Sequence, residues 1–259
     1  MKCHSVTDTH CHLLPGLDDG PKSWQITLGM ARLAVTEGIQ TVVATPHQLG
    51  RYESNTAERI RTVAAEAQRR LARAGIPLTV LPGADVRVRE DLPELLKRGE
   101  VLTLADNHKY LLLELPHDII IPLESLLCRL RHVGIRCILS HPERHRPLMH
   151  KLDLVHSWVQ QDCLIQLTSG SITGHFGPVA QRMSRRLLDA GLVHLVATDA
   201  HDMACRLPLV GEAYRQACRW IGEPAAERLF VINPRAIVRG GSINASISQP
   251  NQKPQRWWS

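Results

Sequence analysis

Two hydrophobic patterns alternate along the chain. Short runs rich in β-branched residues and leucine predict strands, and they lie at residues 6–8, 39–45, 78–84, 110–115, 136–140, 164–168 and 192–198. Longer segments have apolar residues every three or four positions, which is typical of amphipathic helices, and they lie at residues 23–37, 55–74, 123–133, 152–161, 178–190 and 209–220. Regular alternation of strand and helix predicts a parallel sheet covered by helices.

The positions of four glycines agree with the predicted ends of these helices. Gly38, Gly75, Gly134 and Gly191 each stand just before a predicted strand, where a left-handed C-terminal cap is expected. Seven strands without a nucleotide-binding fingerprint after the first favour a distorted (β/α)7 TIM-like barrel over an open doubly wound sheet. We expect one domain over residues 1–240, and a disordered tail over residues 241–259, which are rich in Ser, Asn, Gln and Pro.

Composition narrows the class of protein. The chain has 259 residues, 44% hydrophobic and 22% charged, which is typical of a globular protein. No run reaches the roughly 20 apolar residues of a membrane span, and we expect a cytoplasmic protein. The seven cysteines form no Cys-x-x-Cys pair, so neither a disulfide framework nor a thiolate zinc site is indicated. The net charge of +6 comes mainly from helical arginines not interleaved with aromatic residues, so nucleic-acid binding is not expected.

Metal-binding side chains follow most of the predicted strands. In a parallel barrel, functional groups gather where strands run into loops. The sixth strand ends instead at Thr168, Ser169 and Ser171. The other strand ends carry, or are followed by, the candidate ligands His10, His12, His47, Asp85, Glu114, His141, Asp199 and His201.

The His-x-His pair has a geometric reason. Alternate residues of an extended segment point to one side, so His10 and His12 can reach one ion. Nitrogen and oxygen ligands without thiolate suit manganese, iron or zinc, and several carboxylates favour manganese or iron. Arg144 and Arg206 lie close to these ligands in sequence. Guanidinium groups bind phosphate oxygens in pairs, which makes both arginines candidates for substrate binding.

These motifs resemble those of the PHP (polymerase and histidinol phosphatase) superfamily, and within it the bacterial manganese-dependent protein-tyrosine phosphatases of capsule and exopolysaccharide loci. The resemblance runs from about residue 7 to 239. It is carried by the motifs DTHCHLLPGLDDGPKS, GIQTVVATPHQLGRYE, LPGADVRV, YLLLELPHD, ILSHPERH, LTSGSITGHFG, LVHLVATDAHDMACRLP and LFVINPRAIVRG.

The resemblance implies up to three divalent metal ions. His10, His12 and Asp199 would hold one, residue 85 would bridge it to a second held by Glu114 and His141, and a third would be held by Asp19, His47 and His201. An acidic residue at position 19 is typical of the phosphatase branch. One departure is Asp85, where relatives usually carry glutamate. His145 likewise stands where tyrosine is common.

The implied activity is removal of phosphate from phosphotyrosines in the tail of a bacterial tyrosine kinase, which regulates capsule or exopolysaccharide synthesis. A metal-bridging hydroxide would attack phosphorus, with Arg144, Arg206 and His201 as catalytic residues. No cysteine nucleophile is indicated, because the chain has no Cys-x5-Arg motif. Two alternatives remain at this point: a small-molecule phosphatase of the histidinol-phosphate type, and a non-catalytic module that binds metal or nucleic acid.

Overall fold

The computed structural model describes residues 5–243, and in this part of the chain parallel strands form a three-stranded and a six-stranded sheet. The strand orders are β1-β2-β4 and β3-β5-β6-β7-β8-β9. The strands are β1 (Val6–Cys11), β2 (Ile39–Ala44), β3 (His47–Gln48), β4 (Thr79–Pro82), β5 (Asp85–Arg87), β6 (Tyr110–Glu114), β7 (Arg136–Ser140), β8 (Leu164–Thr168) and β9 (Leu195–Ala197). The predicted α/β fold with parallel strands is confirmed.

Two predicted strands, at residues 39–45 and 78–84, are each followed after a break by a short strand beyond the predicted end. The second continues past Pro46 as β3, and the third breaks at Gly83 and resumes as β5. Proline cannot donate a ladder hydrogen bond, and a Cβ at Gly83 would lie 2.6 Å from Val43 Cγ1. Beyond the breaks, β3 and β5 pair with each other, and His47 lies opposite Asp85. The breaks therefore carry two predicted ligands into the second sheet.

The first and last strands meet at their carboxyl ends. The His12 N–H donates to the Ala200 carbonyl at 2.8 Å, and the Asp199 N–H donates to the His10 carbonyl at 2.8 Å. The Asp8 carboxylate also accepts from the Thr198 hydroxyl at 2.5 Å. These contacts connect the two sheets as expected for a distorted barrel, and they place the loops after β1 and β9 side by side.

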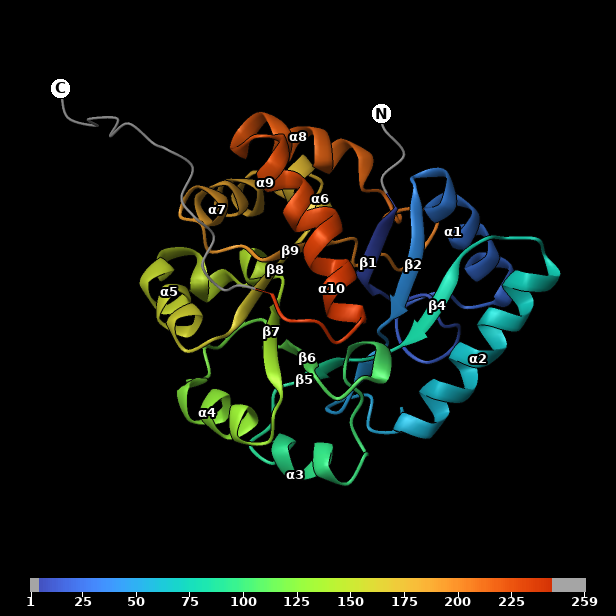
Figure 1. Ribbon diagram of the computed structural model, residues 1–259, viewed down its shortest axis with the longest axis horizontal. Coiled ribbons are helices and arrows are strands. Elements are labelled where there is room, and N and C mark those ends of the chain that lie inside the picture. Colours follow the sequence, from blue (N-terminus) through green and yellow to red (C-terminus); the bar gives the residue numbers. More distant parts are fainter. Residues whose placement is uncertain (1–4, 244–259) are drawn as a thin grey trace.

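Helices pack against the strands, and most of them lie on the outer side (Figure 1). They are α1 (Trp24–Thr36), α2 (Ala57–Arg73), α3 (Leu92–Lys97), α4 (Glu124–His132), α5 (Leu152–Gln160), α6 (Ser169–Thr173), α7 (Gly177–Asp189), α8 (Gly211–Ile221), α9 (Glu223–Glu227) and α10 (Asn233–Val238). The Ser23 and Thr56 hydroxyls cap α1 and α2. The predicted C-terminal glycines are confirmed, because all have positive φ: Gly38, Gly75, Gly134 and Gly191.

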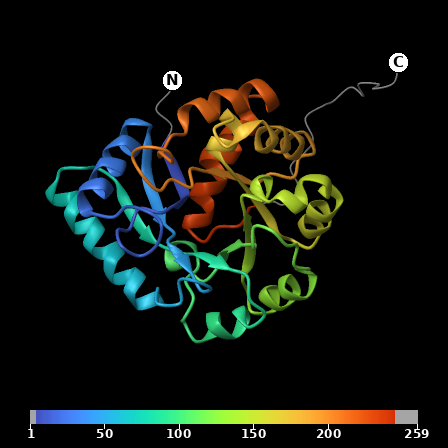
Figure 2. The same ribbon diagram turned by 180° about the vertical axis from the view of Figure 1, so that it is seen from behind.

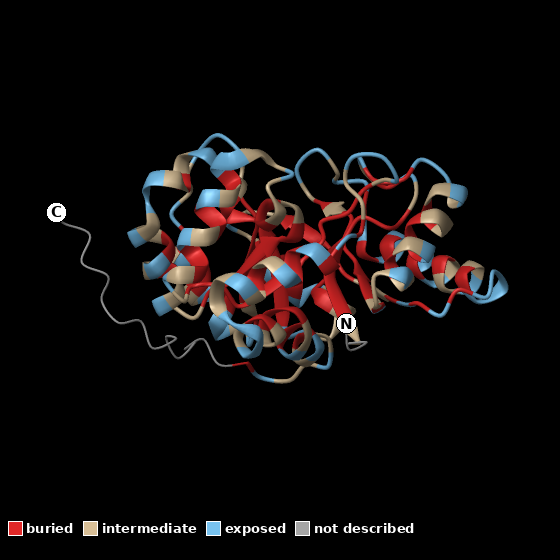
Figure 3. Ribbon diagram, turned by 90° about the horizontal axis from the view of Figure 1, so that it is seen from above, coloured by how far each residue is buried: buried red, intermediate tan, exposed pale blue. Residues whose placement is uncertain are grey.

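Helix α10, which the hydrophobic pattern did not predict, packs against the strand interior. Its Ile237 belongs to a buried cluster with Leu112, Ile138, Leu164 and Leu195 from consecutive strands. Figure 2 shows the same helix behind the strands. In Figure 3 the strands are almost wholly buried, and exposed residues lie on the outer helices and loops. The interior is a packed core, so chemistry is confined to its rim.

The chain continues in contact with the domain beyond residue 240. The Tyr110 hydroxyl donates to the Gly241 carbonyl at 2.7 Å, and Arg136 donates to the carbonyl of the buried Ile243 at 2.6 Å. The rest of the predicted tail, residues 244–259, lies outside the described residues. Among residues 5–243, no helix is long and apolar enough to span a bilayer.

Candidate metal centre

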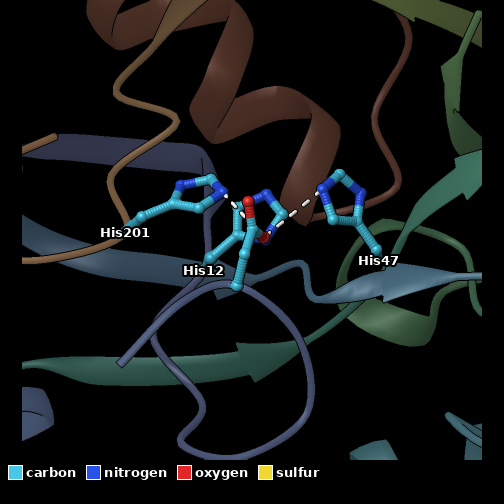
Figure 4. Close-up of side chains that lie close together, drawn as sticks. His12, His47 and His201 are labelled. Carbon is cyan, nitrogen blue, oxygen red and sulfur yellow. Dashed lines mark ion pairs between the residues drawn. The ribbon is translucent and has the colours of Figure 1, made fainter. Parts of the chain in front are cut away.

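The structure brings all of the predicted ligands together at the carboxyl ends of the strands. Their side chains form four overlapping groups whose ligand atoms lie within 4.8 Å of one another in each group. The groups are His12, Asp19, His47 and His201; His10, His12 and Asp85; His10, His141 and Asp199; and His47, Asp85 and Glu114. Figure 4 shows His12, His47 and His201 side by side. The Asp19 carboxylate forms ion pairs with His47 at 3.6 Å and with His201 at 3.3 Å.

The groups differ from the implied three-metal division. That division combines Glu114 with His141, whereas here Glu114 gathers with His47 and Asp85, and His141 gathers with His10 and Asp199. Asp85 lies between these sets, because its Oδ2 atom is 3.7 Å from His10 Nε2 and 3.4 Å from His47 Nδ1. The assignment of each ligand to a particular ion stays a prediction.

The cluster is closed on most sides. His10, His12 and Asp85 are fully buried, whereas the Asp19 and His47 side chains are 52% and 17% exposed. A hollow of about 90 Å³ borders Asp19, His47 and Glu114. Solvent therefore reaches the cluster from the side of Asp19.

The pair His10 and His12 fits a shared cation. Their Nε2 atoms are 3.2 Å apart. The Nδ1 atom of His10 lies 2.9 Å from Gln166 Oε1, and that of His12 lies 2.6 Å from Asp18 Oδ2. Since these acceptors require Nδ1–H, both Nε2 lone pairs face each other, and they must share either a proton or a metal ion.

Asp85 gives a second, independent indication of a cation. Both carboxylate oxygens are buried, and neither has a hydrogen-bond partner among residues 5–243. A buried carboxylate without hydrogen bonds is costly unless a cation compensates its charge. Nearby imidazoles nevertheless hold its pKa below the usual value against the opposing effect of burial. The residues of the site thus fit divalent metal ions.

In the absence of metal, burial and neighbouring charges shift the pKa values of several residues in the cluster. Burial lowers the pKa of His12, but Asp18 and Asp199 outweigh it and raise that pKa to about 10. Burial lowers the pKa of His201 to about 4, with His12 adding repulsion. Burial and the charge of Asp85 raise the pKa of Glu114 to about 7. Metal binding must therefore displace a proton from His12, as expected for an imidazole ligand.

Two of the predicted ligands lie on strained backbone. His141 has φ 34° and Asp199 has φ 53°, in the left-handed region that residues other than glycine seldom adopt. The Asp199 N–H is held by the carbonyl of His10, and the N–H of Arg144 donates to the His141 carbonyl at 3.0 Å. Strain of this kind collects at functional sites, because the surrounding hydrogen bonds maintain it.

Both predicted arginines converge on one oxygen. Arg144 Nη1 and Arg206 Nη2 each form a short ion pair with Asp199 Oδ2, while Asp199 Oδ1 faces His10 Nε2 at 3.2 Å. Arg206 is oriented by its loop, because the Asp202 carboxylate accepts from the Arg206 N–H at 3.0 Å. The two guanidinium groups thus lie together beside the predicted ligands. His201 stacks on His12 at 3.7 Å between ring centroids.

Sequence reasoning missed the residues that orient the ligands. Asp18 accepts from His12 and from the backbone N–H groups of Gly20 and His47, and this charge pairing lowers its pKa to about 2 despite burial. Gln166 could have been noticed as a polar residue inside an apolar strand. Asp18 could not, because it stands beside Asp19 in the sequence and only the loop conformation separates their roles.

We expect Asp18→Asn to weaken metal binding by about 10- to 100-fold, because it removes the charged acceptor that orients His12. Metal titration by calorimetry measures the effect. Asp106→Asn is the matched control, since Asp106 pairs with Arg61 and is not among the predicted ligands. Unchanged metal affinity of the Asp18 variant would show that His12 is oriented by other contacts.

The fold and site together define an α/β protein with a buried cluster of histidines and carboxylates that could hold metal ions, flanked by two arginines. Residues 6–239 match the family described as capsular polysaccharide synthesis, CpsB/CapC, and the chain belongs to that family. It is 38% identical to the tyrosine-protein phosphatase YwqE of Bacillus subtilis over 78% of this chain and 79% of YwqE. It is 29% identical to the tyrosine-protein phosphatase CpsB of Streptococcus agalactiae over 92% of this chain and 100% of CpsB.

Solved structures agree with this assignment. One from a study of YwqE from Bacillus subtilis and CpsB from Streptococcus pneumoniae, called unique metal-dependent tyrosine phosphatases, superimposes with a TM-score of 0.90. It is 33% identical and covers 95% of this chain and 100% of its own. The phosphotriesterase homology protein of Escherichia coli shares the fold, with a TM-score of 0.59 at 13% identity, covering 92% of this chain and 100% of its own. The predicted family resemblance is confirmed.

Proposed function

We propose that this protein is a metal-dependent tyrosine phosphatase of a capsule or exopolysaccharide locus. The observation that carries the proposal is the convergence of Arg144 and Arg206 on Asp199 beside a buried histidine and carboxylate cluster. Phosphate monoesters are dianions, and transfer of the phosphoryl group requires positively charged groups next to its oxygen atoms. The named activities of YwqE and CpsB support tyrosine phosphate as the substrate.

The metal ions would be held by the predicted ligands His10, His12, Asp19, His47, Asp85, Glu114, His141, Asp199 and His201. When bound, such ions stabilise negative charge on phosphate oxygens and lower the pKa of coordinated water. We propose manganese, because the groups in the described chain combine imidazole with several carboxylates and contain no cysteine. Iron and zinc are the alternatives.

The arginines would bind the phosphate oxygens that face away from the metals. Arg206 is suited to this role because its Nε is buried and has no hydrogen-bond partner within residues 5–243. His201 would bind metal in its neutral form, since its pKa lies at about 4. The proposed substrate is the phosphorylated tail of a bacterial tyrosine kinase, and the proposed location is the cytoplasm, where such a tail would be reached.

Metal removal tests this function. We expect EDTA treatment to abolish hydrolysis of a phosphotyrosine peptide, and added Mn²⁺ to restore it, because the ions neutralise charge that the arginines alone cannot. Initial rates with phosphotyrosine peptide, histidinol phosphate and nucleotides compare the tyrosine phosphatase with the small-molecule alternative. Faster turnover of a metabolite than of the peptide would contradict the proposed substrate.

The variant Cys205→Ser is a control for the chemistry. Cys205 is exposed and lies next to Arg206 in the sequence. We expect Cys205→Ser to retain full activity, since nucleophilic attack by a thiolate is not part of the proposal. Full activity after EDTA treatment, combined with loss in this variant, would instead indicate a cysteine-dependent phosphatase.

A further inference from the structure

Strand β8 ends in no predicted metal ligand, yet its end lies against the segment that carries Arg144. The Glu143 side chain is fully buried, and its Oε1 accepts from the Thr168 N–H at 2.9 Å and from the Thr168 hydroxyl at 2.7 Å. This contact anchors the backbone directly before Arg144 to the end of β8. The guanidinium group of Arg144 lies at the end of a flexible side chain and is held on one side by its ion pair with Asp199.

Phe176 provides a surface for that group. The Arg144 Cζ atom lies 4.2 Å from the centre of the Phe176 ring, within the range of a cation–π contact. Phe176 stands between Gly174 and Gly177, which have φ 85° and 88°, a conformation that glycine adopts without strain. The two glycines let the loop turn its aromatic side chain toward Arg144.

Gly170 makes room for the ring. A Cβ at this position would lie 2.8 Å from Phe176 Cε2 and 3.2 Å from Phe176 Cδ2, closer than van der Waals contact allows. Gly170 is part of α6, the short helix that directly follows β8. The end of β8 therefore supports both the backbone before Arg144 and the ring under its guanidinium group.

We propose that Phe176, with Gly170 behind it, is a positioning residue that holds Arg144 in place to bind the substrate phosphate. This inference rests on the proposed phosphatase function. Arg144 and Arg206 both pair with Asp199 Oδ2, so the two cations lie near each other and repel. The negative face of an aromatic ring offsets part of that repulsion and restricts the arginine side chain before phosphate arrives.

Substitution of the ring tests the proposal in the metal-loaded protein. We expect Phe176→Ala to lower kcat/KM for p-nitrophenyl phosphate by about tenfold, as the loss of a partly buried cation–π contact implies. Phe176→Tyr keeps the ring and is expected to stay within about twofold of the original protein, since its π face is unchanged. Gly170→Ala is expected to reduce kcat/KM in the same direction as Phe176→Ala by displacing the ring.

The matched control is Trp220→Ala. It removes another cation–π contact, in which Arg185 lies 5.4 Å from the centre of the Trp220 ring. Trp220 lies on α8 and not in the loops of the metal site. We expect its kcat/KM and metal content to be unchanged. An equal loss in Trp220→Ala and Phe176→Ala would show a general effect of destabilisation and overturn the proposal.

A double-mutant cycle separates positioning from a merely structural role. In the Arg144→Ala background, Phe176→Ala is expected to have no further effect on kcat/KM, because the group that it positions is absent. A tenfold loss in both backgrounds, or loss of bound metal in Phe176→Ala, would overturn the proposal.

Calorimetric binding of inorganic phosphate to the metal-loaded protein gives a readout independent of turnover. We expect the dissociation constant to rise about tenfold in Phe176→Ala, and an unchanged constant would count against the proposal. If the original protein binds phosphate but fails to hydrolyse phosphotyrosine peptide, the proposed function fails while the positioning role of Phe176 is still measured.

Discussion

The double variant His10→Ala/His12→Ala is expected to lose at least about 10³-fold in kcat/KM for phosphotyrosine peptide, because metal ions contribute several kcal/mol to transition-state stabilisation. The two Nε2 atoms lie 3.2 Å apart in a fully buried site. Metal content by plasma mass spectrometry and steady-state kinetics on the same preparation measure both consequences.

The control for this variant replaces two histidines on the protein surface. His132→Ala/His156→Ala removes the same number of imidazoles from exposed positions on α4 and α5, and we expect unchanged metal content and activity. Thermal denaturation of both double variants checks that the fold is retained. Full activity of His10→Ala/His12→Ala would contradict the proposed metal-dependent mechanism.

Asp85→Asn is expected to lower kcat/KM for phosphotyrosine peptide by about 10²-fold or more, because it removes the negative charge that would face the cations. Both Asp85 oxygens lack a hydrogen-bond partner in the described chain. Apart from the imidazoles of His10 and His47, a bound metal ion would compensate their charge. The amide of asparagine has nearly the same size but is neutral, and its NH₂ group cannot bind a metal ion.

Asp85→Glu is the informative comparison. It keeps the carboxylate but adds one methylene, which in a buried site costs about 1–3 kcal/mol of stability when neighbours cannot move. We expect it to remain active within about tenfold of the original protein, since the bridging charge is kept. Metal counts then report whether aspartate and glutamate support the same number of ions. Full metal content and activity in Asp85→Asn would show that residue 85 is not a ligand.

Much of the fold could be predicted because its signals are local. Parallel strands buried on both faces are continuous apolar runs, as in β6, where every residue from Tyr110 to Glu114 is buried. Helix α2 repeats buried residues every three or four positions, namely Ala57, Ile60, Ala64, Ala67 and Leu71. The breaks at Pro46 and Gly83 were not predicted, because whether a strand stops or bends there depends on close contact with a neighbouring strand.

The site, too, was predicted in part from local signals in the sequence. Residue types at strand ends predicted eight of the imidazoles and carboxylates that gather, because parallel strands deliver their carboxyl ends to one rim. Asp19 was implied only by the family resemblance. The helix α10 that closes the strand interior was missed, since Ile237 becomes a core residue only through contact with strands more than 40 residues away.

By itself, the sequence determined the alternation of strands and helices, the glycine caps and the set of candidate ligands, because each depends on residues close together in the chain. Only the tertiary structure decided how those ligands are oriented and supported. Asp18 orients His12 and Gln166 orients His10 through hydrogen bonds, and Phe176 lies under Arg144. The reason is physical: a hydrogen bond or a ring contact depends on angles and distances of a few ångströms between distant segments, which hydrophobic periodicity does not encode.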